Sequence, residues 1–199
     1  MKRFVIAFFL LFALPNTVLA MPEISKPAPA FSGQDINGKT VSLSDYKGKT
    51  VVLEWTNPGC PFVQKFYGAG KMQELQKAAL VDGVVWISIN SGAQGKQGHM
   101  TPEEAKKVTA EKGWSGSAYI LDGKGEIGKA YGAKTTPHMF VIDKEGVLVY
   151  AGAIDDKESA NPSDIATAKN YVSAALADIK ASKPVAVSAS HSYGCGVKY

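Results

Sequence analysis

The stretch TVVLEWTNPGCPFVQKFY, residues 50–67, decides the fold that we expect for this chain. Its β-branched and apolar run Val51–Leu53 predicts a buried strand. The residues Asn57–Gly59 form a turn signal that ends this strand. Cys60 and a proline follow, and because proline is common at the first helical position, we expect a helix over about residues 62–79.

The predicted place of Cys60 favours chemistry at its sulfur. Backbone N–H groups and the helix dipole at a helix N-terminus stabilise a thiolate. An inert buried thiol is the structural alternative, but the position on a turn before a helix argues against it. We therefore expect Cys60 to be reactive or to form a disulfide.

The first 20 residues are predicted to be a signal peptide outside the fold. Lys2 and Arg3 precede an apolar run over residues 4–14, which is shorter than the roughly 20 residues of a membrane span. The residues Val18–Ala20 resemble a small-residue cleavage site. An uncleaved anchor is the alternative, but no longer apolar run occurs. We expect a periplasmic or otherwise exported protein, cleaved near Ala20 and without a membrane span in the mature chain.

Charge and length limit the classes of function that fit the remainder. Removal of Lys2 and Arg3 lowers the formal net charge from +4 to +2, and no basic stripe suggests nucleic-acid binding. The length suits one domain, so the two cysteines are not needed for folding. We expect a domain over residues 21–182 and a polar tail over residues 183–199 that carries Cys195. The histidines and cysteines are too scattered to suggest a metal site.

The other segments predict an α/β chain with a central mixed sheet flanked by helices and an N-terminal β-hairpin. Strands over residues 51–53 and 84–90, joined by the helix after Cys60, form a right-handed βαβ unit. The further expected elements are a hairpin around Asn37-Gly38, a helix over 102–112 opened by a capping box at Thr101, a strand over 119–122, a short helix over 126–131, an antiparallel pair over 139–142 and 147–151, and one long amphipathic helix from a cap at Asn161 to Ile179.

This order of elements resembles the thioredoxin superfamily over residues 27–179. The segments PAPAF (27–31) and DINGKTVSLSDYKGK (35–49) are similar to the lead-in of peroxiredoxins (thiol-specific antioxidant proteins) and of exported thioredoxin-like proteins. The block TPHMFVIDKEG (136–146) is similar to the cis-proline strand and the following hairpin of thioredoxins. The resemblance implies a thioredoxin-like fold.

A gapless comparison with the thioredoxin motif places Cys60 at the nucleophilic cysteine, Glu54 at the buried acid and Val63 where the second cysteine belongs. The chain departs from ordinary peroxiredoxins, because Asn57 replaces their threonine and Pro137 their arginine. It most resembles a peroxiredoxin-like subgroup with a single cysteine followed by Pro-Phe and with a C-terminal tail of the form YGCxVKY, here residues 193–199.

The resemblance implies roles for further residues. Cys195 is expected either to resolve Cys60 as a second redox thiol or to form a permanent structural disulfide with it. A Cys60–Cys195 disulfide would close a long loop and stabilise the folded state by up to ~5 kcal/mol on the chain-entropy model. Glu54 is expected to relay a proton or to serve a structural role. Pro137, if cis, would place the backbone of Thr136 against Cys60 for pairing with a substrate segment, and a rigid turn is the alternative.

The main hypothesis is an exported thiol–disulfide oxidoreductase with Cys60 as the nucleophile. It implies no dissociable cofactor and a protein thiol, disulfide or reductant as partner. A peroxiredoxin-like thiol peroxidase is the first alternative, in which Cys60 becomes a sulfenic acid. A non-catalytic binding protein with a structural Cys60–Cys195 disulfide is the second.

Overall fold

The centre of the fold is a five-stranded mixed sheet with strand order β5-β4-β3-β7-β8. The computed structural model describes residues 22–199, so the predicted signal peptide lies outside the described residues. In the sheet, β3 (Val51–Trp55) runs parallel to β4 (Val85–Asn90) and antiparallel to β7 (His138–Ile142). The outer strands are β5 (Ala118–Leu121), parallel to β4, and β8 (Leu148–Gly152), antiparallel to β7.

The smaller elements surround this sheet. Two short two-stranded ladders pair β1 with β2 and β6 with β9. Their bounds and those of the helices are β1 (Ser32–Gln34), β2 (Thr40–Ser42), β6 (Thr135–Thr136), β9 (Cys195–Gly196), α1 (Pro61–Gly68), α2 (Lys71–Val81), α3 (Pro102–Glu111), α4 (Glu126–Ala130), α5 (Tyr171–Lys180) and the 3₁₀ helices η1 (Leu43–Tyr46) and η2 (Pro162–Thr167).

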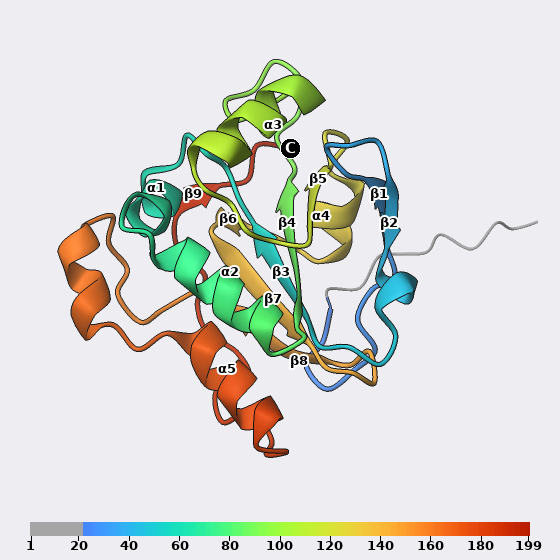
Figure 1. Ribbon diagram of the computed structural model, residues 1–199, viewed down its shortest axis with the longest axis vertical. Coiled ribbons are helices and arrows are strands. Elements are labelled where there is room, and N and C mark those ends of the chain that lie inside the picture. The colour runs from blue at the N-terminus through green and yellow to red at the C-terminus, as the bar shows by residue number, and fades with distance from the viewer. Residues whose placement is uncertain (1–21) are drawn as a thin grey trace, which may run out of the picture.

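Strand β3 is buried on both faces because a layer of chain covers each face of the sheet. Helices α1, α2 and α5 lie on one side, and α4 with the β1–β2 hairpin lies on the other (Figure 1). Val51, Leu53 and Trp55 therefore enter the core under α4 and the hairpin. Val52 enters the core under α1, α2 and α5. Burial on both faces explains why the strand is apolar in nearly every position.

The expected α/β architecture is confirmed, including the N-terminal hairpin and the capping box at Thr101. Parallel pairing of β3 with β4 also confirms the βαβ unit. Within residues 22–199, no helix is both long enough and apolar enough to cross a membrane.

The prediction of one helix over residues 62–79 was wrong. The chain forms two helices, α1 and α2, separated by Ala69 and Gly70. Gly70 caps α2 with φ 73°, a left-handed conformation that interrupts the helical path. The apolar periodicity continues across this break, so it did not mark the boundary.

The prediction of one long helix from Asn161 to Ile179 was also wrong. Asn161 caps only η2, and a second asparagine, Asn170, caps α5 with a side-chain hydrogen bond from the Ser173 N–H of 2.8 Å. Ala168 between them is extended, with ψ 139°. Two capped helices follow one another where the spacing of apolar residues suggested one.

Replacement of Gly70 tests the break between α1 and α2. A Cβ at Gly70 would meet no atom within 4 Å, so Gly70→Ala costs only the left-handed backbone strain, about 1 kcal/mol of unfolding free energy. Gly68, the last residue of α1, also has open space, so Gly68→Ala should be neutral or slightly stabilising. Urea unfolding of both variants measures the difference, and equal effects of the two would contradict the described break.

Candidate functional site

Cys60 lies at the junction of the central strand and the first helix. Strand β3 ends at Trp55, and the following loop places Cys60 as the N-cap of α1. The backbone of Cys60 is extended, and Pro61 is the first residue of the helix. The Asn57 side chain shapes this loop by accepting a hydrogen bond of 2.9 Å from the Gly59 N–H. Although Cys60 begins a helix, it is only 1% exposed.

The cis-proline loop supplies the first contact of Cys60. The Thr136–Pro137 peptide bond is cis. The Cys60 thiol donates a hydrogen bond of 3.0 Å to the Thr136 carbonyl oxygen. The backbone of Thr136 thus lies against the sulfur, as the sequence predicted for a cis Pro137.

The C-terminal tail supplies the second contact. Residues Cys195 and Gly196 form β9, which pairs antiparallel with β6 so that Thr136 faces Cys195. The Cys195 and Cys60 side chains are within hydrogen-bonding reach of each other, and both cysteines are free thiols. Residues 135 positions apart in the sequence are therefore neighbours in the fold.

Gly194 permits this close approach of the tail. A Cβ on Gly194 would lie 2.1 Å from the Thr136 carbonyl oxygen, and its φ of +130° is one that other residues rarely adopt. Only a residue without a side chain therefore fits at this position against Thr136.

The two thiols have opposite pKa shifts. Burial raises the pKa of Cys60, but a hydrogen bond from the Cys195 side chain and another from the Thr136 side chain oppose this shift. Backbone hydrogen bonds of Cys195 and of Val63, the latter in the first turn of α1, act in the same direction, so the pKa of Cys60 lies below its ordinary value. Burial, and then the hydrogen bond and charge of Cys60, raise the pKa of Cys195 to about 11. Cys60 is therefore the more acidic thiol of the pair, and Cys195 is the hydrogen-bond donor when Cys60 ionises.

Glu54 is fully buried on β3 within a polar network rather than facing solvent. Its carboxylate accepts hydrogen bonds from Tyr67 on α1, Gln76 on α2, Trp86 and Ser88 on β4. Burial raises its pKa, and these donors oppose the shift. Cys60 is not among its hydrogen-bond partners within residues 22–199, so any influence on the thiol passes through other groups.

The sequence analysis missed a buried charged cluster beside the tail. Lys65 of α1 has no exposed side-chain surface, and its Nζ lies 3.6 Å from Oδ2 of Asp155. The Tyr193 hydroxyl donates to Oδ1 of Asp155. No local pattern in the sequence connects Lys65, Asp155 and Tyr193.

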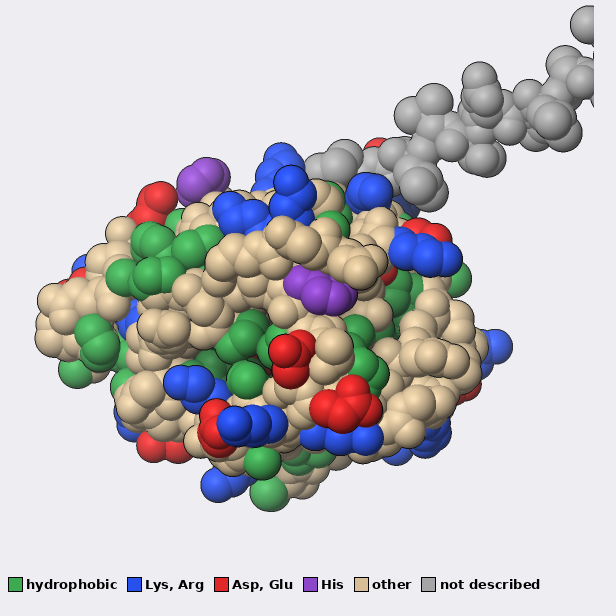
Figure 2. Space-filling view, turned by 90° about the horizontal axis from the view of Figure 1, so that it is seen from above, with side chains coloured by type: hydrophobic (Ala, Val, Ile, Leu, Met, Phe, Trp, Pro, Cys, Tyr) green, Lys and Arg blue, Asp and Glu red, His purple; other side chains and the backbone are tan. Residues whose placement is uncertain are grey.

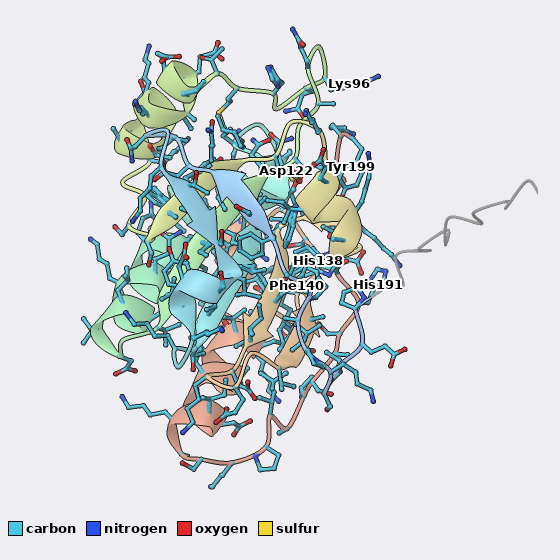
Figure 3. All side chains as sticks on the ribbon, turned by 90° about the vertical axis from the view of Figure 1, so that its right-hand side faces the viewer. Lys96, Asp122, His138, Phe140, His191 and Tyr199 are labelled. Atoms are coloured by element: carbon cyan, nitrogen blue, oxygen red, sulfur yellow. The ribbon has the colours of Figure 1, made fainter. Side chains whose placement is uncertain are left out.

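A second tyrosine anchors the end of the tail. The Tyr199 hydroxyl donates a hydrogen bond of 2.8 Å to the Ala133 carbonyl, and its ring lies near Asp122 (Figure 3). The Lys198 carbonyl accepts a hydrogen bond of 2.8 Å from the Ala93 N–H. The tail is thus attached on both sides of Cys195.

His138, next to Pro137, is bonded away from the thiol. Its Nδ1 accepts a hydrogen bond of 3.2 Å from the Lys134 N–H, and its ring packs 4.5 Å from the Phe140 ring on β7 (Figure 3). Burial, followed by the charge of Lys134, lowers its pKa to about 4. His138 is therefore a neutral, structural histidine near pH 7.

The chemistry available here is that of sulfur. Among residues 22–199, no group of three or more His, Cys, Asp or Glu side chains is placed to hold a metal ion. The face of the molecule in Figure 2 carries both positive and negative side chains among uncharged ones. A thiolate and a protonated thiol in contact can exchange with a disulfide.

Comparison with known proteins gives a family and a fold. The profile of the AhpC/TSA family matches residues 24–151. A crystal structure of an uncharacterized conserved protein from Geobacillus kaustophilus has 29% identity and a TM-score of 0.77, covering 90% of this chain and 93% of that one. The thioredoxin domain of a thiol-disulfide oxidoreductase from Bacteroides vulgatus has 22% identity and a TM-score of 0.54, covering 73% and 96%. These matches confirm the thioredoxin-like fold.

Curated relatives share part of the sequence. The methylamine utilization protein MauD of Methylobacillus flagellatus is 27% identical over 139 residues, which cover 69% of this chain and 60% of MauD. The thiol-disulfide oxidoreductase ResA of Bacillus cereus is 31% identical over 134 residues, which cover 64% of this chain and 68% of ResA. The chain thus spans less than two thirds of MauD.

Replacement of Cys195 tests its role as hydrogen-bond donor. In Cys195→Ala the Cys60 thiolate loses its strongest donor, so the pKa of Cys60 should rise toward that of an ordinary thiol. Ultraviolet absorbance of the thiolate against pH measures this, with Cys60→Ala as the blank. An unchanged pKa of Cys60 would show that the contact with Cys195 does not stabilise the thiolate.

The pH dependence of stability tests the buried His138. The unfolded chain takes up a proton at His138 near pH 6.5 and the folded chain only near 4, so the unfolded state binds more protons between these values. The free energy of unfolding should therefore fall as the pH drops from about 6.5 to about 4.

His138→Asn is the matched variant for this measurement. Asparagine keeps an acceptor for the Lys134 N–H but does not titrate, so its urea-derived stability should depend less on pH over the same window. Equal slopes for the variant and the wild type would contradict the assignment.

Proposed function

The chain belongs to the AhpC/TSA family, and from this membership and the contact of Cys60 with Cys195 we propose that it is an exported thiol–disulfide oxidoreductase. Cys60 acts as the nucleophile and Cys195 as the resolving thiol. The observation that carries the proposal is the pairing of a buried thiolate-forming cysteine with a second free thiol on β9. The name of the relative ResA supports the same reaction class.

The first step consumes the Cys60 thiolate. Its sulfur attacks one sulfur of a substrate disulfide, the Cys60–substrate bond forms, and the other substrate sulfur leaves as a thiolate. The hydrogen bonds that lower the pKa of Cys60 below its ordinary value favour the thiolate that this attack requires.

The second step uses Cys195. Its thiol loses a proton to solvent and attacks Sγ of Cys60, the Cys60–Cys195 bond forms, and the second substrate sulfur leaves as a thiolate. Burial, and then the hydrogen bond and charge of Cys60, raise the pKa of Cys195 to about 11 before the reaction. Once Cys60 is bonded to the substrate, its hydrogen bond and charge no longer act on Cys195, so the pKa of Cys195 falls at the step in which Cys195 attacks. The substrate is reduced, and a thiol partner protein restores the dithiol.

The proton-relay role of Glu54 remains a prediction. A relay to the site would run through Tyr67, which donates to Glu54 at 2.9 Å and lies on α1, the helix that Cys60 caps. Burial raises the pKa of Glu54 against the effect of its hydrogen-bond donors, which makes the carboxyl group a better proton acceptor than an exposed glutamate.

A thiol peroxidase is the second candidate, favoured by the burial of Cys60 at 1% exposure. A peroxide is smaller than a protein disulfide and needs less access. The Cys60 thiolate would attack one peroxide oxygen to give a sulfenic acid and hydroxide, and Cys195 would then form the disulfide and release water. Asn57, at the position of the peroxiredoxin threonine, is engaged by Gly59 and Gln97 instead. Peroxide consumption no faster than that of free cysteine rules this candidate out.

Single-cysteine variants test the proposed reaction with glutathione disulfide or insulin as substrate and dithiothreitol as reductant. Cys60→Ser should abolish turnover, because it removes the attacking sulfur. In the absence of dithiothreitol, Cys195→Ser should complete only the first step and accumulate a substrate adduct on Cys60, which intact-protein mass spectrometry detects. Turnover that persists in Cys60→Ser would overturn the proposal.

A further inference from the structure

The tail is the cover of Cys60. Its β9 residues occupy the backbone edge of Thr135 and Thr136, and the Val197 N–H donates to the Lys134 carbonyl at 3.0 Å. The same edge is where the Thr136 carbonyl meets the Cys60 thiol. A polypeptide cannot pair with this edge while β9 is in place, and Cys60 itself is 1% exposed.

Tyr193 attaches this cover to α1. Its ring packs edge-on to Phe62, two residues after Cys60, with the ring centroids 5.9 Å apart. Its hydroxyl donates to Oδ1 of Asp155, and the residue is only 4% exposed. Burial and then the contact with Asp155 raise the pKa of Tyr193, so the hydroxyl remains a donor.

Asp155 makes this attachment stronger than an ordinary tyrosine hydrogen bond. Its carboxylate is buried beside Lys65, whose Nζ lies 3.6 Å from Oδ2 and also donates to the Lys157 carbonyl at 3.1 Å. Oδ2 accepts no hydrogen bond within the described residues, and Oδ1 accepts from Tyr193 and from the Lys157 N–H. Loss of the Tyr193 hydroxyl leaves this buried charge with one hydrogen bond.

We propose that Tyr193 is the positioning residue that holds Cys195 against Cys60, and that outside disulfides reach Cys60 only after the Tyr193–Asp155 contact opens. The proposal rests on the proposed function for its catalytic meaning. The Cys60 thiolate attacks a disulfide while the tail is open. When Tyr193 returns to Asp155, Cys195 is again beside Cys60 and displaces the substrate sulfur.

The rate of alkylation of Cys60 by iodoacetamide measures the open fraction, because a covered thiol reacts only during opening. Tyr193→Phe keeps the ring on Phe62 and removes the hydroxyl, so Cys60 should react about tenfold faster. Tyr171→Phe is the matched control, since that hydroxyl makes no hydrogen bond within residues 22–199, and its rate should equal the wild-type rate. Peptide mass spectrometry counts the label on Cys60, at about pH 9 to ionise the thiol in every variant.

Gly194→Ala displaces the tail by a different route, because its Cβ would meet the Thr136 carbonyl oxygen. Faster labelling in both Gly194→Ala and Tyr193→Phe supports the proposal. Faster labelling in Gly194→Ala alone overturns it by showing that the tail covers Cys60 without the Tyr193 contact. Wild-type rates in both variants overturn it as well.

Labelling needs no turnover, so this outcome is independent of the proposed function. A chain without disulfide turnover but with Tyr193-dependent labelling would refute the proposed oxidoreductase activity. It would still support the role of Tyr193 in holding the tail over Cys60. Circular dichroism and urea unfolding of each variant confirm that the rates belong to folded protein.

Discussion

The pairing of the tail with the backbone of Thr135 and Thr136 is the constraint on which the site depends. It places Cys195 beside Cys60, covers the thiol and supplies the donor that lowers the pKa of Cys60. Cys195 is the other free cysteine among residues 22–199, and this ladder brings it to Cys60. The rest of the tail, from Tyr193 to Tyr199, maintains this short ladder through contacts on either side.

Two cysteines separated by 134 residues thus form one redox pair in our proposal. In the thioredoxin motif that this sequence resembles, both thiols lie on one helical turn. Here Val63 takes the second position and packs in the core under α1. A partner thiol on a separate strand can move away without unwinding α1, whereas two thiols on one turn are fixed by the helix. Because Cys195 lies on a separate strand, its reaction with Cys60 depends on whether the tail is bound at β6. Two cysteines on one helical turn have no such dependence.

The sequence was informative where local chemistry determines the backbone. The strand, turn, cysteine and proline of residues 51–61 predicted the place of Cys60, and Asn37-Gly38 and Thr101 predicted a hairpin and a capped helix. It did not predict where a helix is interrupted if the spacing of apolar residues continues across the interruption, as at Gly70 and Ala168. One glycine or one extended residue ends a helix there, while the buried positions on either side keep a helical period.

The buried cluster was outside the reach of sequence reasoning for a different reason. Lys65 lies in a short helix where a lysine ordinarily faces solvent, and its partner Asp155 is 90 residues away. No local pattern relates them, because the tertiary packing of Tyr193 over both removes them from water. Glu54 differs, since the comparison with the thioredoxin motif placed it at a buried acid, although its hydrogen-bond partners became known only from the structure.

The most direct test of the redox pair is peptide-mapping mass spectrometry of the chain equilibrated across a series of glutathione redox buffers. We expect a peptide linking Cys60 to Cys195 to appear and disappear in one reversible two-electron transition, at a potential above about −300 mV. A link that persists below that potential would identify a permanent clasp. The absence of any link under oxidising buffers would contradict the pairing of the two thiols.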